Sequence, residues 1–258
     1  MSSTETLYVG WQHRESRRWF VVGRLTRVSN GPDLSDREFE FVYVAGVNEA
    51  LSRGFQPFIA FPDLDRAVRS RELLPFFRNR VMPRNRPDYR AYLEQLALEP
   101  TAEEFAILAR SGGQRTPERG EIELFAAPVR RADGSYEAYF LVRGIRHVDL
   151  NHEVVATLGE GDRLLCVLDV QNTYNPEAVL LRADSKGLVG YVPDYLCGEV
   201  SLLLRQKCDV RVTIARINNS PTVPVQNRIM CRLEANAPAD LRPFSDPRFA
   251  PLDHALAA

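Results

Sequence analysis

Hydrophobic residues in the first part of the chain recur with the period of β-strands. Apolar runs lie around Leu7–Val9, Trp19–Val28 and Phe39–Val44. The third run, EFEFVYV, alternates apolar and polar positions, as a strand with one buried face does. Between the second and third runs, residues 30–36 read NGPDLSD, and Asn-Gly-Pro is a strong turn signal. The pattern predicts strands separated by a turn.

Three helix-like segments follow these strands. They read SRELLPFFRNRV, RPDYRAYLEQLAL and TAEEFAILARSGG, at residues 70–81, 86–98 and 101–113. Their apolar residues group on one side, which is typical of an amphipathic helix, although Pro75 weakens or kinks the first. A strand-like GEIELFAAPV closes this half, so the pattern predicts an α+β domain over residues 1–127.

The third helix-like segment carries signals at both of its ends. Thr101 with Glu104 predicts a capping box, in which each side chain bonds an amide at the helix start. Gly112 and Gly113 stand where a residue in the left-handed conformation ends a helix. We therefore expect this helix to be the best defined of the three.

From residue 136 the pattern changes to short strands separated by turn residues. We expect strands at Tyr136–Ile145, Arg163–Val170, Ala178–Ala183, Leu188–Val192, Val210–Ile217 and Arg228–Leu233. One helix interrupts them, from Asp194, its expected N-cap, to about Gln206. Six short strands and one helix predict a small six-stranded β-barrel over residues 128–235. Residues 236–258 are rich in proline, alanine and aspartate, so we expect an extended or disordered tail.

Composition and charge limit the possible functions. The chain has 258 residues, of which 45% are hydrophobic and 26% charged, values that are ordinary for a globular protein. Its net charge is −1 and neither half is basic, which argues against binding duplex DNA by counter-ion release alone. A small, shape-specific nucleic-acid site is compatible with this balance. No apolar run reaches the length of a membrane span and the N-terminus lacks signal-peptide features, so we expect a cytoplasmic protein without a membrane partner.

The spacing of cysteines and histidines gives little support to a metal site or to catalysis. The cysteines, Cys166, Cys197, Cys208 and Cys231, form no C-x-x-C, and no histidine lies at zinc-finger distance. We expect buried, reduced thiols, with a zinc module built on them as the weaker alternative. The chain contains no H-E-x-x-H, nucleophile elbow or paired-carboxylate motif. We therefore expect no cofactor, no metal and no enzymatic activity.

A short polar loop interrupts two apolar strands in the second half. The stretch DVQNTYNPEAVLL, Asp169–Leu181, places two asparagines, a tyrosine and a proline between the strands. Asparagine amides can hydrogen-bond to a ligand, and a tyrosine ring can stack on a flat base. Asparagines are also good turn formers, so these two could instead serve only to close the loop.

Three segments of the second half carry motifs of a known family. The segments LVRGIRHV, LGEGDRLLCVLDVQNTYNPEAVLL and KGLVGYVPDYL, at residues 141–148, 158–181 and 186–196, together resemble the HIRAN family. This family is a compact β-barrel module of helicase-like DNA-repair proteins and of many bacterial proteins. The resemblance spans roughly residues 136–235 and implies a module that holds the 3′ end of single-stranded DNA. Such binding requires stacking surfaces for the bases and a cation for the phosphate.

The resemblance also implies roles for individual residues. Arg146 matches the arginine of the family's strand motif and would pair with a phosphate. His147 and Tyr174 stand where stacking aromatic residues are found. Asn172 would order the loop or contact the nucleic-acid backbone, and Tyr191 could line the same groove.

Two positions of the loop depart from the family pattern. Asn175 stands where an aspartate commonly reads the 3′-hydroxyl, and asparagine can accept a hydrogen bond there but brings no charge. Glu177 falls where a second asparagine is frequent, and its carboxylate would weaken binding beside a phosphate path. The departures put specificity for DNA ends in question.

The predicted site residues also have ordinary structural interpretations. Tyr174 could pack over the end of the barrel, and Tyr191 could belong to the core. His147 could be an ordinary strand histidine, and Arg146 could serve a surface ion pair. The nucleic-acid interpretation therefore depends on the arrangement of the motif and not on any single residue.

The first half resembles the N-terminal subdomain of HipA-type toxin kinases. The resemblance runs from FEFVYV through FQPFIAFPDL and LLPFFRNRVMPRNRPDYRAYL to FAILARSGGQRTPERGEIEL. It implies a domain that docks another protein, whereas the glycine-rich loop and catalytic aspartate of a kinase core are missing. The alternative to a DNA-binding protein is therefore an antitoxin-like regulatory partner of a HipA-type kinase that does not bind DNA.

Overall fold

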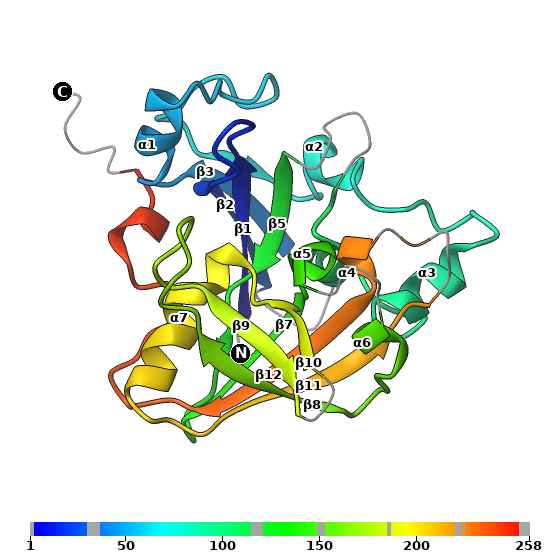
Figure 1. Ribbon diagram of the computed structural model, residues 1–258. Helices are drawn as coiled ribbons and strands as arrows, with labels where there is room; N and C mark the ends of the chain where they lie inside the picture. Colours follow the sequence, from blue (N-terminus) through cyan, green and yellow to red (C-terminus); the bar gives the residue numbers. More distant parts are fainter. Residues whose placement is uncertain are drawn as a thin grey trace. The chain divides into compact units, whose positions relative to one another are not determined.

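The computed structural model describes residues 3–29, 37–114, 121–148, 153–184, 187–219, 223 and 225–252. The chain forms two compact units, each with its own β-sheet (Figure 1). Unit 1 comprises Met1–Tyr89, Thr101–Ala127 and Phe244–Ala258, and unit 2 comprises Arg90–Pro100 and Pro128–Pro243. The predicted boundary after residue 127 coincides with a boundary between the two units. The predicted domains are contiguous in sequence, whereas unit 1 also contains Phe244–Ala258 and unit 2 also contains Arg90–Pro100.

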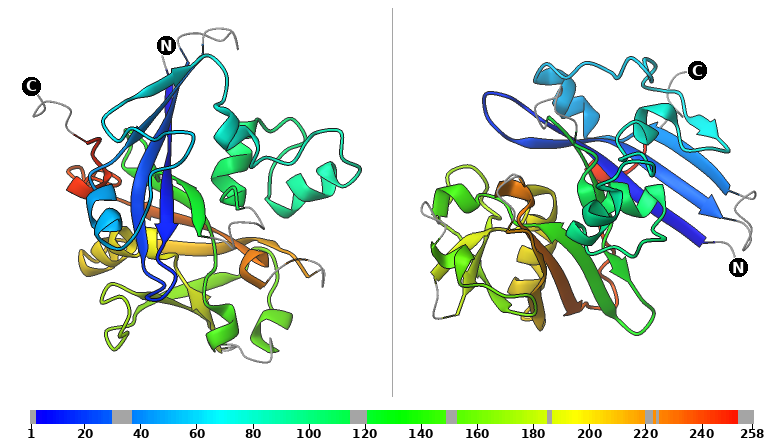
Figure 2. Two further views of the ribbon diagram at one scale, coloured as in Figure 1. Left: turned by 90° about the horizontal axis from the view of Figure 1, so that it is seen from above. Right: turned by 90° about the vertical axis from the view of Figure 1, so that its right-hand side faces the viewer.

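Unit 1 contains a five-stranded antiparallel sheet (Figure 2). Its strands are β1 (Ser3–Gln12), β2 (Trp19–Ser29), β3 (Arg37–Tyr43), β4 (Val68–Ser70) and β5 (Ile122–Ala126), in the order β4-β3-β2-β1-β5. The strand-like runs of the first half are confirmed, whereas the three-residue β4 is too short to leave a periodic pattern. The turn predicted at residues 30–36 lies outside the described residues.

Short helices accompany this sheet. They are α1 (Val47–Ser52), α2 (Pro75–Arg78), α4 (Glu104–Ser111) and the 3-10 helix η4 (Pro247–Phe249). Of the helix predicted over residues 70–81, only the four residues of α2 are helical, and the rest of the prediction is wrong. The helix begins at Pro75, because the missing N–H and fixed φ of proline are tolerated only at a helix start. Helix α3 (Tyr89–Gln95) is shorter than predicted, and all of it except Tyr89 belongs to unit 2.

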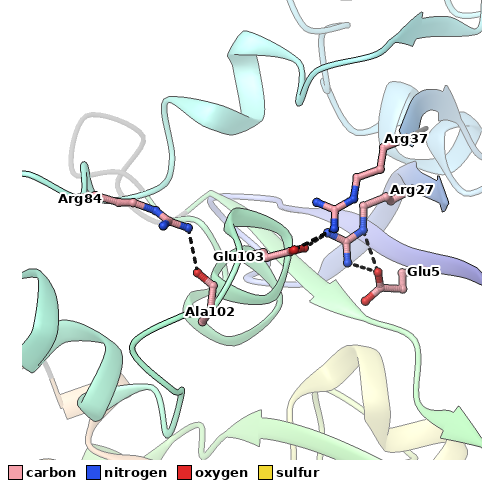
Figure 3. A network of polar contacts seen from close by, with 6 residues as sticks. All are labelled: Glu5, Arg27, Arg37, Arg84, Ala102 and Glu103. Carbon is pink, nitrogen blue, oxygen red and sulfur yellow. Dashed lines mark hydrogen bonds and ion pairs between the residues drawn. The ribbon is translucent and has the colours of Figure 1, made fainter. Parts of the chain in front are cut away.

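Ion pairs rather than the predicted capping box hold the start of α4 (Figure 3). Glu103 occupies the N-cap position, and its side chain makes no capping hydrogen bond within the described part of the chain. Its carboxylate accepts from Arg37 at 2.8 Å and from Arg27 at 2.5 Å, and Arg27 also pairs with Glu5. Hydrogen bonds from the two arginines, Arg37 first, lower the pKa of Glu103 against the opposing effect of burial. The helix ends as predicted, with Gly112 in the left-handed conformation at φ 71°.

The core of unit 1 is rich in aromatic rings. Phe41 of β3 stacks on Phe61 with ring centroids 4.3 Å apart, and Phe58 lies 4.8 Å from Phe76. The buried Tyr43 hydroxyl donates to the Phe61 carbonyl at 2.7 Å and accepts from the Phe58 amide at 2.8 Å. Burial raises the pKa of Tyr43 to about 12, so the phenol stays protonated and keeps its donor role. The period-two pattern of β3 thus correctly identifies the face that packs on the core.

Unit 2 contains a seven-stranded antiparallel sheet. Its strands are β6 (Val129–Arg130), β7 (Ser135–Leu141), β8 (Arg163–Leu168), β9 (Val179–Ala183), β10 (Gly187–Tyr191), β11 (Val210–Ile217) and β12 (Ile229–Asn236), in the order β10-β9-β8-β11-β12-β7-β6. The predicted six-stranded barrel is not confirmed, because the sheet does not close within the described residues. An isolated antiparallel bridge between Arg143 and Tyr191 is what joins β10 to the segment that follows β7.

Besides α3, four helical segments of the described residues belong to unit 2. They are α5 (Ile145–Val148), α6 (Glu153–Ala156), α7 (Asp194–Arg205) and the 3-10 helix η3 (Val225–Asn227). The strand predicted to reach Ile145 ends at Leu141, and a short helix begins where the prediction continued the strand. The long helix is confirmed, but Pro193 and not Asp194 occupies its N-cap position. Asp194 is therefore free of the capping role and bonds a neighbouring loop instead.

The segment after β12 is packed through residue 252. Phe244 and Phe249 stack with centroids 4.4 Å apart, and both rings meet Tyr8 edge-on within unit 1. Pro251 forms a bridge with Val44. This packing differs from the extended or disordered tail that the composition predicts, because two phenylalanines supply apolar area that the proline-rich composition conceals. Residues 253–258 lie outside the described part.

Candidate nucleic-acid interface

The loop between β8 and β9, here called the 169–178 loop, is held in shape by its own asparagines. The Oδ1 atom of Asn172 accepts from the backbone amides of Tyr174 and Asn175, both at 3.0 Å. The Oδ1 atom of Asn175 accepts from the Glu177 amide at 2.9 Å. Side-chain oxygens that bond amides two or three residues ahead close Asx turns. The turn-forming interpretation of both asparagines is therefore realised, and the loop has a fixed path without a ligand.

Two aspartates anchor these asparagines. The Oδ2 atom of Asp169 accepts from the Nδ2 group of Asn172 at 3.1 Å and from the Tyr191 hydroxyl at 3.0 Å. The Nδ2 group of Asn175 donates to Asp194 at the start of α7. Neither aspartate belongs to the site predicted from the sequence. The available signal is their position, directly after β8 and directly after the G-Y-V-P motif.

Tyr191 joins this loop to the segment that precedes α5. Its backbone amide donates to the Arg143 carbonyl at 2.7 Å, and its carbonyl accepts from the Arg143 amide at 2.9 Å. Its ring is half-buried, and burial together with the hydrogen bond to Asp169 raises the pKa of the phenol. The phenol therefore remains a donor at neutral pH. Since Tyr191 also pairs with Leu180 at the start of β9, the loop, the end of β10 and the start of α5 lie at one end of the sheet.

Two glycines permit this close approach. A Cβ atom on Gly190 would lie 2.5 Å from both the carbonyl oxygen of Arg143 and a methyl group of Val142. Gly144 adopts φ +66°, and a Cβ atom there would lie 3.0 Å from the Tyr191 ring. The glycines of the G-I-R-H and G-Y-V-P motifs are thus required by the contact between their two segments.

The groups predicted to contact nucleic acid are exposed. Tyr174 is 77% exposed, so it does not pack over the end of the sheet. Arg146 and His147 are exposed on α5, and the ion pairs of the described residues include none for Arg146. His147 lies on a helical turn whose amide bonds the Gly144 carbonyl at 2.9 Å, so its interpretation as a strand histidine is wrong. The candidate stacking and phosphate-binding groups therefore face solvent, and Tyr174 does so from a loop of fixed shape.

The charges around this loop are mixed. Asp169, Glu177 and Asp194 are acidic, whereas Arg143 and Arg146 are basic. Glu177 is exposed, and its backbone, not its carboxylate, takes part in the loop. Such a balance favours contact through ring stacking and a single phosphate over long-range attraction to a polyanion.

An exposed apolar strip lies on the strands beside the loop. Leu165 and Val167 of β8 are 39% and 43% exposed, Leu188 of β10 is 39% exposed, and Val170 in the loop is 78% exposed. This strip is not predicted from the sequence, because β8 reads RLLCVL, a continuous apolar run that does not distinguish a buried face from an exposed one.

Potential metal ligands do not cluster within the described residues. Within the described residues, no group of three or more His, Cys, Asp or Glu is arranged to hold a metal ion. Cys166, Cys197, Cys208 and Cys231 are free thiols, and burial raises the pKa of Cys166 to about 12. In the part of the chain that the structure describes, no helix has the length and apolar character that a membrane span needs.

Comparison with known proteins identifies one part of the chain. A protein of known crystal structure from Lactobacillus plantarum is 19% identical, with 40% of this chain and 97% of that chain covered and a TM-score of 0.33. The HIRAN domain of human HLTF is 14% identical, with 42% of this chain and 75% of that chain covered and a TM-score of 0.28. The search of curated proteins gave no match.

The family comparison concerns unit 2. It does not extend to the first half, for which the resemblance to HipA-type kinases and the docking role stay predictions. The HIRAN domain profile matches residues 135–236, from β7 to the end of β12, and it confirms the HIRAN resemblance for that part of the chain.

Proposed function

We propose that residues 135–236 bind single-stranded DNA, with preference for a free 3′ end, and that the protein acts by binding rather than by catalysis. HIRAN domains are generally DNA-binding modules, and the profile match to this segment supports nucleic-acid binding. The observation that carries the finer proposal is Tyr174, which is 77% exposed on a loop that is closed by its own hydrogen bonds. An aromatic ring held in water by a rigid loop is suited to stacking on a base.

The fixed loop lowers the entropic penalty of binding. Asn172 and Asn175 already hold the backbone on either side of Tyr174, so a ligand does not have to order the loop. Stacking of one base on Tyr174 contributes about 1–3 kcal/mol. His147 would supply a second, weaker stacking surface, and Arg146, exposed on the same short helix, would pair with a phosphate.

The 3′-hydroxyl would be received by Asn175 and Asp194 together. One oxygen of Asp194 accepts from the Asn175 amide group, and further lone pairs of the two side chains are available as acceptors. Asp194 would thus supply the negative charge that asparagine lacks. A 3′-phosphate would bring its own charge against Asp194 and Glu177, so a blocked end should bind more weakly.

A titration of labelled oligonucleotides tests this proposal. Fluorescence anisotropy with a short 5′-labelled single strand should give a dissociation constant of about 1 μM or lower. The double variant Tyr174→Ala, Arg146→Ala should lose at least about 30-fold in affinity, because one stacking contact and one charge-assisted contact are removed. Val170→Ala serves as the matched control, since Val170 is 78% exposed in the same loop but offers no ring. Equally weak binding by wild type and double variant would remove the proposal.

A further inference from the structure

Unit 1 contains a cavity that none of the roles above uses. It is open to solvent, and its volume of about 640 Å³ is in the range of sites that hold small ligands. Four segments of unit 1 line it: the β1–β2 hairpin, the chain that follows α1, the chain around α2, and the start of β5. The cavity is therefore a feature of the folded unit and not of one flexible loop.

The floor of the cavity is a row of aromatic rings. Trp11 lies 5.5 Å from Phe55, Phe55 lies 5.3 Å from Phe58, and Phe58 lies 4.8 Å from Phe76. Phe55 is buried, while Trp11, Phe58 and Phe76 are only partly buried and line the open space. Successive rings are tilted by 59°, 85° and 39° to one another, so the floor offers both ring faces and ring edges to an aromatic ligand.

A buried arginine adds a cation to this floor. The guanidinium of Arg80 lies 4.4 Å from the Phe76 ring centroid and donates to the Gly113 carbonyl at 3.0 Å. Arg80 is 6% exposed, so its guanidinium is held in place beside the ring. This contact fixes a planar cation at the edge of the apolar surface.

The described residues at the rim of the cavity are charged. Arg14 pairs with Glu121, and Arg53 and Glu15 also line the cavity. Arg53 is exposed, and the ion pairs of the described residues do not include it. A rim guanidinium without a carboxylate partner, next to an aromatic floor, is the arrangement that binds an anionic group attached to a ring.

We propose that this cavity binds a small molecule that combines a planar aromatic ring with one anionic group. The ring would contact Trp11, Phe58 and Phe76, and the anionic group would face Arg53. A mononucleotide and an aromatic carboxylate both have this chemistry, and the titration described below distinguishes between them. All participating residues belong to unit 1, so the proposal stands apart from DNA binding by residues 135–236.

Tryptophan fluorescence of the full chain can report this binding directly. The chain has two tryptophans, Trp11 in the cavity and Trp19 in β2. The variant Trp19→Phe leaves Trp11 as the sole reporter. Titration with adenosine monophosphate, adenosine, phenylacetate and inorganic phosphate should give saturable quenching by the monophosphate or by phenylacetate, with a dissociation constant below about 1 mM. Adenosine and inorganic phosphate should each bind at least about fivefold more weakly, because each lacks one of the two required groups.

Charge variants at the rim complete the test. Arg53→Gln should weaken the anionic ligand about tenfold, whereas Glu15→Gln should tighten it. Arg66→Ala, an exposed arginine of unit 1 outside the cavity, should leave binding unchanged and serves as the matched control. Saturable binding of the monophosphate would identify a mononucleotide as the class of ligand. Saturable binding of phenylacetate alone would identify an aromatic carboxylate. The proposal is overturned if neither saturates up to about 5 mM, or if Arg53→Gln binds as wild type does.

Discussion

The contact between Gly190 and the segment before α5 can be tested by adding one methyl group. In Gly190→Ala the new Cβ atom would lie 2.5 Å from the Arg143 carbonyl oxygen and from a Val142 methyl group. Neither partner is the end of a flexible side chain, so the backbone of one segment has to move. Overpacking of this kind costs about 1–3 kcal/mol.

Loss of the backbone bridge between Arg143 and Tyr191 adds to the destabilisation by Gly190→Ala. Arg143 and Tyr191 exchange two backbone hydrogen bonds of 2.9 and 2.7 Å, and each contributes about 0.5–1.5 kcal/mol. Together with the steric term, we expect Gly190→Ala to destabilise this end of unit 2 by about 3 kcal/mol. At 1.4 kcal/mol per tenfold change, the protection of the Arg143 and Tyr191 amides should fall by about two orders of magnitude.

Hydrogen exchange measured by mass spectrometry is the suitable assay. Both tryptophans belong to unit 1, so their fluorescence does not report on unit 2. Peptides that cover residues 139–148 and 187–194 should exchange faster in the variant. Gly159→Ala is the matched control, because its added Cβ would meet nothing closer than an Asp162 oxygen at 4.0 Å. If Gly190→Ala shows the same protection as Gly159→Ala, the contact does not hold the two segments together.

Three further substitutions test other parts of the structure. Glu103→Gln should destabilise unit 1 by about 1 kcal/mol at pH 7, because solvent screens the ion pairs of a carboxylate that is 39% exposed. Urea unfolding followed by tryptophan fluorescence measures this loss of stability. Since the folded pKa of Glu103 is lowered, this contribution is present above the usual carboxyl pKa and is lost as the pH falls through the lowered value, so the difference from wild type should disappear once the pH is below that value. A difference that stays constant as the pH is lowered through the acid range would contradict the assignment. Tyr191→Phe removes the bond to Asp169 and should weaken single-stranded DNA binding about three- to tenfold, measured by anisotropy, whereas unchanged affinity would show that the bond does not preorganise the loop. Asp194→Asn should reduce the preference for a 3′-hydroxyl over a 3′-phosphate end about tenfold, and an unaltered ratio of the two dissociation constants would exclude Asp194 from end recognition.

Local patterns predict most of the strands but fewer of the helices. The strands of unit 2 are recognisable because apolar runs alternate with turn residues, and each run is long enough to show its period. Helix α2 fails because Pro75 can begin a helix but cannot stand inside one. Helix α5 is missed because four residues are too few for a 3.6-residue period, and its β-branched Ile145 and Val148 favour a strand.

Contacts between distant residues account for the remaining differences. Thr101 and Glu104 match the local motif of a capping box, but the helix start is instead held by Glu103. Its carboxylate forms ion pairs with Arg27 and Arg37, which are 76 and 66 positions away in the sequence. Asp169 enters the candidate site through a bond to Tyr191, which a local reading of the loop does not contain. The aromatic floor of the unit 1 cavity is assembled from separate segments in the same way.

The arrangement of the 169–178 loop explains why its asparagines can be structural without weakening the DNA interpretation. If Asn172 and Asn175 gave up their bonds to the loop amides in order to contact a ligand, the backbone around Tyr174 would lose the bonds that fix it, and the ring would be ordered only on binding. Their Nδ2 groups donate hydrogen bonds to Asp169 and Asp194, which hold the two asparagine side chains in place. Recognition is thereby divided between residues that shape the loop and residues that face solvent. Because the surrounding charges nearly balance, affinity has to come from the exposed ring and one phosphate contact, which are the groups that the proposed double variant removes.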